Sequence, residues 1–154
     1  MDITLKNKSD IIGTHWIEFN VSGTLNNYKH WADNSKYLDE YAYNFYTDIF
    51  EKVADNFNYY GDTRFDKEQL KRLKQGIIDR ISIVDNLNTL QDIIEFGNKT
   101  SHALNLTQEI EEAYDKQNGQ PNKLVSDIKA LGHDLSDLID NCIQQDKTLI
   151  VWGL

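Results

Sequence analysis

The spacing of apolar residues changes near residue 35, and this change predicts two kinds of secondary structure. Before it, Ile17, Phe19 and Val21 alternate with polar residues, as Ile3 and Leu5 do nearer the start. Alternation with a period of two is typical of a strand buried on one face. The first part of the chain is therefore expected to be extended.

The end of the chain predicts a further strand. Residues 147–152 are rich in apolar and β-branched side chains and end in Trp152. A short apolar run of this kind is consistent with a buried strand. We expect it to pair with the N-terminal strands, so that one small sheet joins both ends of the chain.

After residue 35, apolar side chains recur at steps of three and four, which is the spacing of a helix with one buried face. The first predicted helix starts near Ser35 and runs to about Asn56 or Tyr60. The second starts at Asp66, whose carboxylate can cap the helix while Gln69 reaches back in a capping box. This pattern predicts two helices in the first half of the chain.

Three more helices follow. The third runs from about Thr89 to Gly97, a typical C-terminal residue, and the fourth from about Thr107 to Gln117. The fifth begins at Pro121, because proline suits the first turn of a helix. Its apolar stripe consists of Leu124, Ile128, Leu131, Leu135, Leu138 and Cys142.

The expected fold class is mainly α: a single helical domain of about five helices, with a small sheet formed by the N-terminal strands and the C-terminal strand. A chain of 154 residues suits one domain, here residues 1–154. A domain of this size can bury roughly 68–70% of its unfolded surface, so its core needs no disulfide or metal.

Composition adds an expected compartment. Cys142 is the only cysteine and cannot form a disulfide within the chain, which favours a reducing environment. The first eight residues lack the basic and apolar segments of a signal peptide, and no apolar run approaches the length of a membrane span. We therefore expect a soluble cytoplasmic protein with no membrane partner.

Net charge limits the choice of partner. The formal charge of −9 at pH 7 would repel a phosphate backbone, so nucleic acid is not expected to bind directly. A basic protein is an expected partner. The alternative explanation is that the acidity serves only solubility.

The sequence contains no pattern typical of a catalytic or metal site. The four histidines lack paired metal-ligand spacing, and a glycine-rich phosphate loop is absent. Cys142 falls on an apolar helix face, where an inert core thiol is expected. His102 has no acid near it in sequence to orient it. We expect a protein that is not an enzyme and has no cofactor, metal or catalytic residue.

The acids are grouped in a way that predicts a binding surface. No lysine or arginine lies between Ser101 and Asp115 or between Ala130 and Asp146, although each stretch contains four acids. A helix without bases forgoes stabilising acid–base pairs at four-residue spacing, so a field of one sign favours a role in attracting basic partners. A solvated helix face is the alternative.

Aromatic residues are concentrated between Tyr28 and Tyr60, where they are interleaved with carboxylates. Tyr43 falls off the apolar stripe of the first predicted helix, and tyrosine beside carboxylates is typical of a protein-binding surface. Core packing is expected to account for most of the other aromatics. The predicted partner-binding residues are Asp39, Glu40, Tyr43, Asp48, Tyr59, Tyr60, Glu111, Glu112, Asp134 and Asp137.

These features together resemble the immunity proteins of bacterial toxin systems, particularly those of contact-dependent growth inhibition. The resemblance rests on a small acidic chain, tyrosines beside acids, and the ending Lys-Thr-Leu-Ile-Val-Trp-Gly-Leu at residues 147–154. It implies one-to-one binding to a basic toxin domain, often a nuclease, whose active site the immunity protein occludes.

Two other functions stay open. The segment Gly132-His133-Asp134-Leu135 resembles one found in helical HEPN-type ribonucleases and their relatives. Those enzymes place an arginine four to six residues before the catalytic histidine, and here no arginine precedes a histidine at that distance. The second alternative is an acidic structural or scaffolding domain.

Overall fold

The computed structural model describes residues 1–13, 15–21, 31–102 and 104–153. Within them, helices and strands make an α+β arrangement that is 54% helical and 13% strand. The expectation of a mainly α fold is therefore wrong, because the sheet has four strands and forms a full layer. In chain order the elements are a 3₁₀ turn (Lys8–Asp10), β1 (Trp16–Asn20), β2 (Lys36–Asp39), α1 (Glu40–Tyr43), α2 (Thr47–Val53), β3 (Asp62–Phe65), α3 (Lys67–Val84), α4 (Leu90–Thr100), α5 (Thr107–Lys116), α6 (Pro121–Gln144) and β4 (Leu149–Trp152).

The sheet is antiparallel throughout, with the strand order β2-β1-β4-β3. The C-terminal strand β4 pairs with β1, as the sequence predicted, with Phe19 opposite Val151. Its other neighbour is β3, a strand that the sequence pattern did not predict. Residues 1–5, which also alternate, form no strand, and the backbone of the N-terminal segment pairs with the sheet at an isolated bridge between Lys6 and Tyr37.

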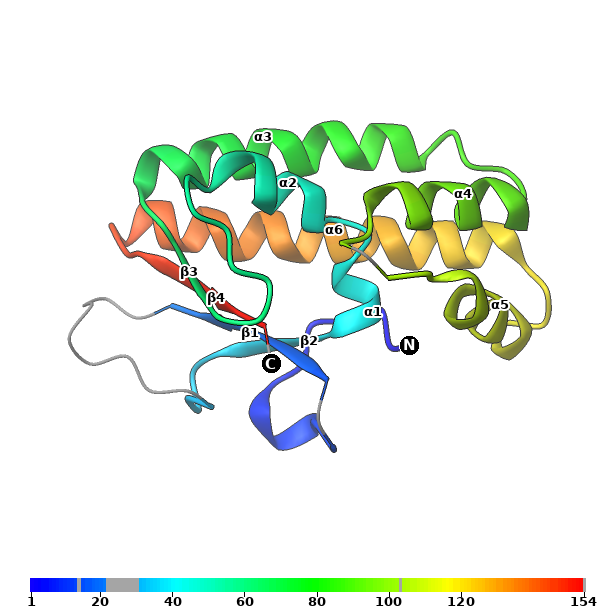
Figure 1. Cartoon of the computed structure of the whole chain (residues 1–154), viewed down its shortest axis with the longest axis horizontal. Helices are drawn as coiled ribbons and strands as arrows, with labels where there is room; N and C mark the ends of the chain where they lie inside the picture. The colour runs from blue at the N-terminus through cyan, green and yellow to red at the C-terminus, as the bar shows by residue number, and fades with distance from the viewer. Residues whose placement is uncertain (14, 22–30, 103, 154) are drawn as a thin grey trace.

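The long helices α3 and α6 lie side by side on one face of the sheet, while α4 and α5 lie at one end of this pair (Figure 1). The predicted start of α3 is confirmed, because Asp66 and Gln69 make both hydrogen bonds of a capping box. Proline opens α6 as expected. Helix α4 continues past Gly97 to Thr100, so the predicted end at Gly97 is wrong.

The predicted helix from Ser35 to Asn56 or Tyr60 is also wrong, since this segment forms β2, α1 and α2 in succession. Almost every residue from Tyr37 to Phe50 is buried or half-buried. A segment enclosed on all sides has no polar face, so its apolar spacing does not distinguish a helix from a strand. Asp39 ends β2 and caps α1 by accepting hydrogen bonds from the backbone of Tyr41 and Ala42.

The core joins this segment to the long helices. Tyr46 is fully buried and donates its hydroxyl hydrogen bond to the Ile128 carbonyl of α6 at 2.8 Å. Gly132, one turn further along α6, lies against the same tyrosine and against Ile81 of α3.

Among the described residues, no helix is long and apolar enough to cross a membrane.

Candidate functional site

The predicted partner-binding residues divide into an internal group and an exposed group. Asp39, Glu40, Tyr43, Asp48 and Tyr59 are buried or half-buried and are engaged within the fold. Glu40, Tyr43 and Tyr59 are buried and present little surface to a partner in this conformation, while the assignment of Asp39 and Asp48 to an interface stays a prediction. The exposed group consists of Tyr60, Glu111, Glu112, Asp134 and Asp137.

Two acids of the internal group organise the start of α1. Asp39 accepts hydrogen bonds from the first helical N–H groups and from the backbone N–H of Asp2 at 3.2 Å. Glu40 is 9% exposed and lies 3.5 Å from Nδ1 of His15. Both carboxylates thus hold the N-terminal segment and α1 together, which is a structural role.

Tyr43 and Tyr59 belong to a cluster of buried aromatic rings. The centroids of these two rings are 6.3 Å apart. Burial raises the pKa of both hydroxyls above the ordinary value for tyrosine. The Tyr59 hydroxyl accepts a hydrogen bond from Nδ2 of Asn44 at 2.7 Å. The Tyr43 hydroxyl is buried and makes no hydrogen bond to any residue that the structure describes. Neither ring is available to a partner in this conformation.

Asp48 forms an ion pair with the buried Arg80 of α3. Both of its oxygens accept hydrogen bonds from Nη2 of Arg80 at 2.7 Å, and Nη1 of the same arginine donates to the Phe45 carbonyl at 3.0 Å. The guanidinium also lies 5.2 Å from the centre of the Phe96 ring. Because Arg80 is only 8% exposed, its charge depends on Asp48 for compensation.

The acids of α6 and the turn after it differ in how they are neutralised. Asp140 accepts two hydrogen bonds from Lys74 of α3, at 2.6 and 2.7 Å, and Asp146 accepts one from Lys67 at 2.9 Å. Asp134 and Asp137 are exposed, and within the described part of the chain neither has an ion pair or a side-chain hydrogen bond. The acidic field of α6 is therefore concentrated at these two residues.

Asp134 and Asp137 border a shallow groove of about 300 Å³. Its other lining residues are Leu5, Lys36, Leu138 and Asn141. Lys36 donates to Oδ1 of Asn7 at 2.6 Å, so this cation is held by a neutral partner. The groove combines apolar side chains with carboxylates that lack a bound cation.

The other exposed residues lie on different elements. Glu111 and Glu112 lie on α5, where Glu112 accepts a hydrogen bond from Gln108 at 3.0 Å. Tyr60 is 66% exposed beside β3, with its ring edge-to-face against Tyr59. The aromatic segment begins at Tyr28, which lies outside the described residues, as does Leu154 at the end of the chain.

His102 is oriented by an acid that sequence distance concealed. Its Nδ1 contacts the carboxylate of Glu51 on α2, and its ring stacks on Tyr59 with centroids 4.6 Å apart. Asn44 fixes the histidine backbone by accepting from its N–H at 2.8 Å. The pair joins residues that are 51 positions apart, so no local motif could have indicated it.

The histidine of the HEPN-like segment has a different setting. His133 lies on the exposed side of α6, next to Asp134. Arg80 of α3 is buried with Asp48 and is not free to act with a histidine. Cys142 lies on the opposite, buried side of α6, where burial raises the pKa of its thiol to about 11.

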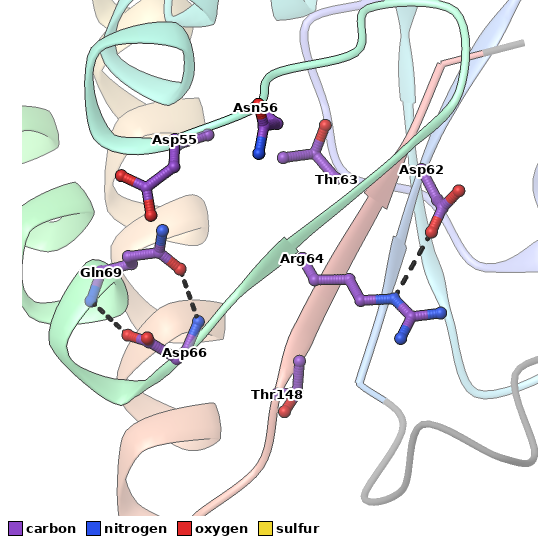
Figure 2. A pocket seen from close by; sticks show the side chains of 9 residues that line it. Asp55, Asn56, Asp62, Thr63, Arg64, Asp66, Gln69 and Thr148 are labelled. Atoms are coloured by element: carbon purple, nitrogen blue, oxygen red, sulfur yellow. Dashed lines mark hydrogen bonds and ion pairs between the residues drawn. The ribbon is translucent and has the colours of Figure 1, made fainter.

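A second groove, of about 480 Å³, lies beside β3. Figure 2 shows Asp55 and Gln69 on the side of β3 that faces away from β4. Asp66 and Gln69 are occupied by the capping box, and Nε of Arg64 lies 3.4 Å from Asp62. The groove is polar, and carboxylates outnumber its single arginine.

Metal chemistry gains no support from these clusters. Among the described residues, no group of three or more histidine, cysteine, aspartate or glutamate side chains could hold a metal ion.

In comparisons with protein-family models, with curated proteins and with solved structures, nothing matches this chain.

Proposed function

We propose that this chain is an immunity protein that binds a basic toxin domain one-to-one and occludes its active site. The observation that carries the proposal is the pair Asp134 and Asp137, two exposed carboxylates without cationic partners among the described residues. The lysines of α3 that pair with this part of the chain, Lys67 and Lys74, bind Asp146 and Asp140 and not these two residues.

Electrostatics explains why this arrangement suits a basic partner. Carboxylates without a bound cation outnumber the single lysine of this groove, and the negative field that remains raises the rate of association with a basic domain. A nuclease cleft binds phosphates with basic side chains, so carboxylates placed in that cleft compete for the same contacts. Leu5 and Leu138 in the same groove add apolar surface to the contact.

The mechanism is occlusion. Asp134 and Asp137 take the place of substrate phosphates, and Glu111, Glu112 and Tyr60 are further exposed residues that a large partner can contact. The internal tyrosines Tyr43 and Tyr59 are not part of this mechanism, because they are buried in the core.

Affinity capture from source cells induced for toxin production is the first experiment, with washes at low and high salt. The expected result is one basic domain at one-to-one ratio, which arrests growth when produced alone and is harmless when produced with this chain. Recovery of no such domain, or of one whose toxicity the chain does not suppress, would overturn the proposal and favour the structural or scaffolding alternative.

Association kinetics with the captured domain then test the role of α6. The double variant Asp134→Lys/Asp137→Lys is expected to associate at least about tenfold more slowly at low salt. The matched control is Asp79→Lys/Glu95→Lys, which makes the same charge change on α3 and α4 at exposed acids that each accept one hydrogen bond from a glutamine. An equal effect of both pairs would show that net charge alone matters and would remove α6 from the interface.

A further inference from the structure

The two outer edges of the sheet differ in whether another segment of the chain pairs with them. At the β2 edge, Tyr37 exchanges two backbone hydrogen bonds with Lys6, at 2.8 and 3.0 Å. The N-terminal segment therefore pairs with that edge at Tyr37. At the β3 edge no described segment makes such an exchange, and the strand borders a groove instead.

The pairing register shows which groups of β3 face the groove. The Gly153 N–H donates to the Gly61 carbonyl at 3.3 Å, so these residues form a hydrogen-bonded pair. Such pairs alternate along an antiparallel ladder, which places Thr63 and Phe65 in the next pairs with β4. The N–H and C=O groups of Asp62 and Arg64 consequently point away from the sheet.

These outward groups make no backbone hydrogen bond to any other described element. The next outward N–H, that of Asp66, is already taken by Oε1 of Gln69 at 2.9 Å. Asp62 and Arg64 thus offer two donors and two acceptors with strand spacing along one side of an open groove of about 480 Å³. An extended peptide satisfies such a row by adding a strand.

The charge of the groove determines the kind of peptide. Asp55 forms the wall opposite β3, and Asp62 and Asp66 lie along the strand and its end (Figure 2). The single cation, Arg64, lies beside Asp62 and is partly neutralised by it. A segment with lysine or arginine side chains therefore complements the groove, whereas an acidic segment is repelled.

We propose that β3 accepts an extended, lysine- or arginine-bearing segment of a protein partner as a fifth strand, hydrogen-bonded to Asp62 and Arg64. The identity of that partner as a toxin domain rests on the proposed function above. The geometry of the edge does not, because it follows from the register and the groove. A second copy of the chain is disfavoured as the occupant, since each copy carries a formal charge of −9.

The test uses a seven-residue peptide of alternating lysine and valine with blocked ends, added to the ¹⁵N-labelled full chain. The Asp62 and Arg64 amide signals should shift and exchange at least about tenfold more slowly with deuterium. The same peptide with glutamate in place of lysine should cause neither change. Absence of both effects with the lysine peptide at millimolar concentration would overturn the proposal.

A pair of variants separates the backbone from the side chain. Arg64→Pro removes the outward N–H without removing a bond to β4, since proline is tolerated on an edge strand when its nitrogen faces away from the ladder. It should weaken peptide binding by about tenfold or more. Arg64→Ala keeps the N–H and should bind as tightly as the parent chain or more tightly. Equal weakening by both variants would overturn strand addition.

Three further outcomes test strand addition at β3 separately from the immunity function. If Arg64→Pro misfolds, which its amide spectrum would show, the exchange rates of the parent chain decide the question. Protection of Asp62 and Arg64 without peptide, together with the mass of a dimer in solution, would identify a second copy as the occupant and overturn the inference. If the peptide adds to β3 but no toxin is neutralised, the strand-addition site stands and the immunity function fails.

Discussion

Residues 37–60 and helix α6 carry most of the side chains that the sequence nominated for a protein interface, yet the fold places them differently. In the first region, Tyr43 and Tyr59 are buried, and Asp48 is turned inward and bonded to Arg80 of α3. In α6, leucines line one side, and Asp134 and Asp137 remain exposed on the other. The regions meet where Tyr46 packs against Gly132.

The difference between these two regions shows under which conditions a charged or aromatic residue indicates a binding surface. In α6 an apolar stripe is satisfied by α3 and the sheet layer, so polar residues off the stripe have to face outward. Residues 37–50 contain too many apolar side chains for one stripe, and each of them is buried or half-buried. The acids of this segment are then retained to compensate buried donors and cations, rather than to meet a partner.

The largest expected effect comes from removing the acid of the buried ion pair. Asp48→Ala should lower the free energy of unfolding by about 3–5 kcal/mol, because it leaves the Arg80 guanidinium buried without a counter-charge. Urea unfolding monitored by circular dichroism measures the loss.

The control for this variant is Asp55→Ala, which removes an exposed acid two residues after α2. Its effect should stay within about 0.5 kcal/mol. A loss below about 1 kcal/mol for Asp48→Ala would show that the ion pair is dispensable, and Asp48 would become a candidate for the interface again.

Local signals allowed part of the fold to be predicted. The capping box at Asp66, the proline at Pro121 and the apolar end of the chain each act within a few residues, and each element formed where expected. Strand β3 was not predicted, although Thr63 and Phe65 alternate with polar residues. It has only four residues, and alternation over so short a run does not distinguish a strand from a loop. Its pairing with β4 joins residues more than 80 positions apart, which no local pattern encodes.

A smaller loss is expected from filling the contact between the two regions. In Gly132→Ala the new Cβ would contact the Tyr46 hydroxyl and lie 2.7 Å from Cγ1 of Ile81. Crowding of this kind costs typically 1–3 kcal/mol, and the higher helix propensity of alanine returns about 1 kcal/mol, so a net loss of about 1–2 kcal/mol is expected.

Calorimetric melting measures this change, with Ser126→Ala on the exposed side of α6 as the control. The control should shift the free energy of unfolding by no more than about 0.5 kcal/mol. Stabilisation by Gly132→Ala would mean that Tyr46 can move away, and that the two regions are less tightly joined than the structure indicates.

The candidate site was predictable only where side chains face solvent. Asp134 and Asp137 follow from their position opposite the apolar stripe of one helix. The burial of Tyr43 and Tyr59 depends on Asn44, Phe19 and His102, which reach the same cluster from separate elements. Sequence periodicity does not report contacts of this range, so it placed Tyr43 on a surface.

The two buried tyrosines are expected to respond in opposite directions when their hydroxyls are removed. Tyr43→Phe should raise the free energy of unfolding by about 1 kcal/mol, because its hydroxyl is buried without a partner among the described residues. Tyr59→Phe should lower it by about 1 kcal/mol, because Asn44 loses an acceptor. Chemical unfolding of both variants in one buffer gives the comparison, and a loss in both would indicate that the Tyr43 hydroxyl has a partner in solution.

The smallest effect on stability is expected at the acids assigned to the partner. Asp134→Asn/Asp137→Asn should change the free energy of unfolding by less than about 0.5 kcal/mol, with a slight gain favoured because two like charges are removed from an acidic chain. Asp140→Asn on the same helix should lose about 0.5–1 kcal/mol, since it weakens the ion pair with Lys74. Thermal melts at low and high salt separate the two, because only the Asp140 loss should shrink as salt screens the pair. A stability loss in the Asp134/Asp137 variant equal to that of Asp140→Asn would show that these carboxylates are also used within the fold, and the contrast between α6 and residues 37–60 would then disappear.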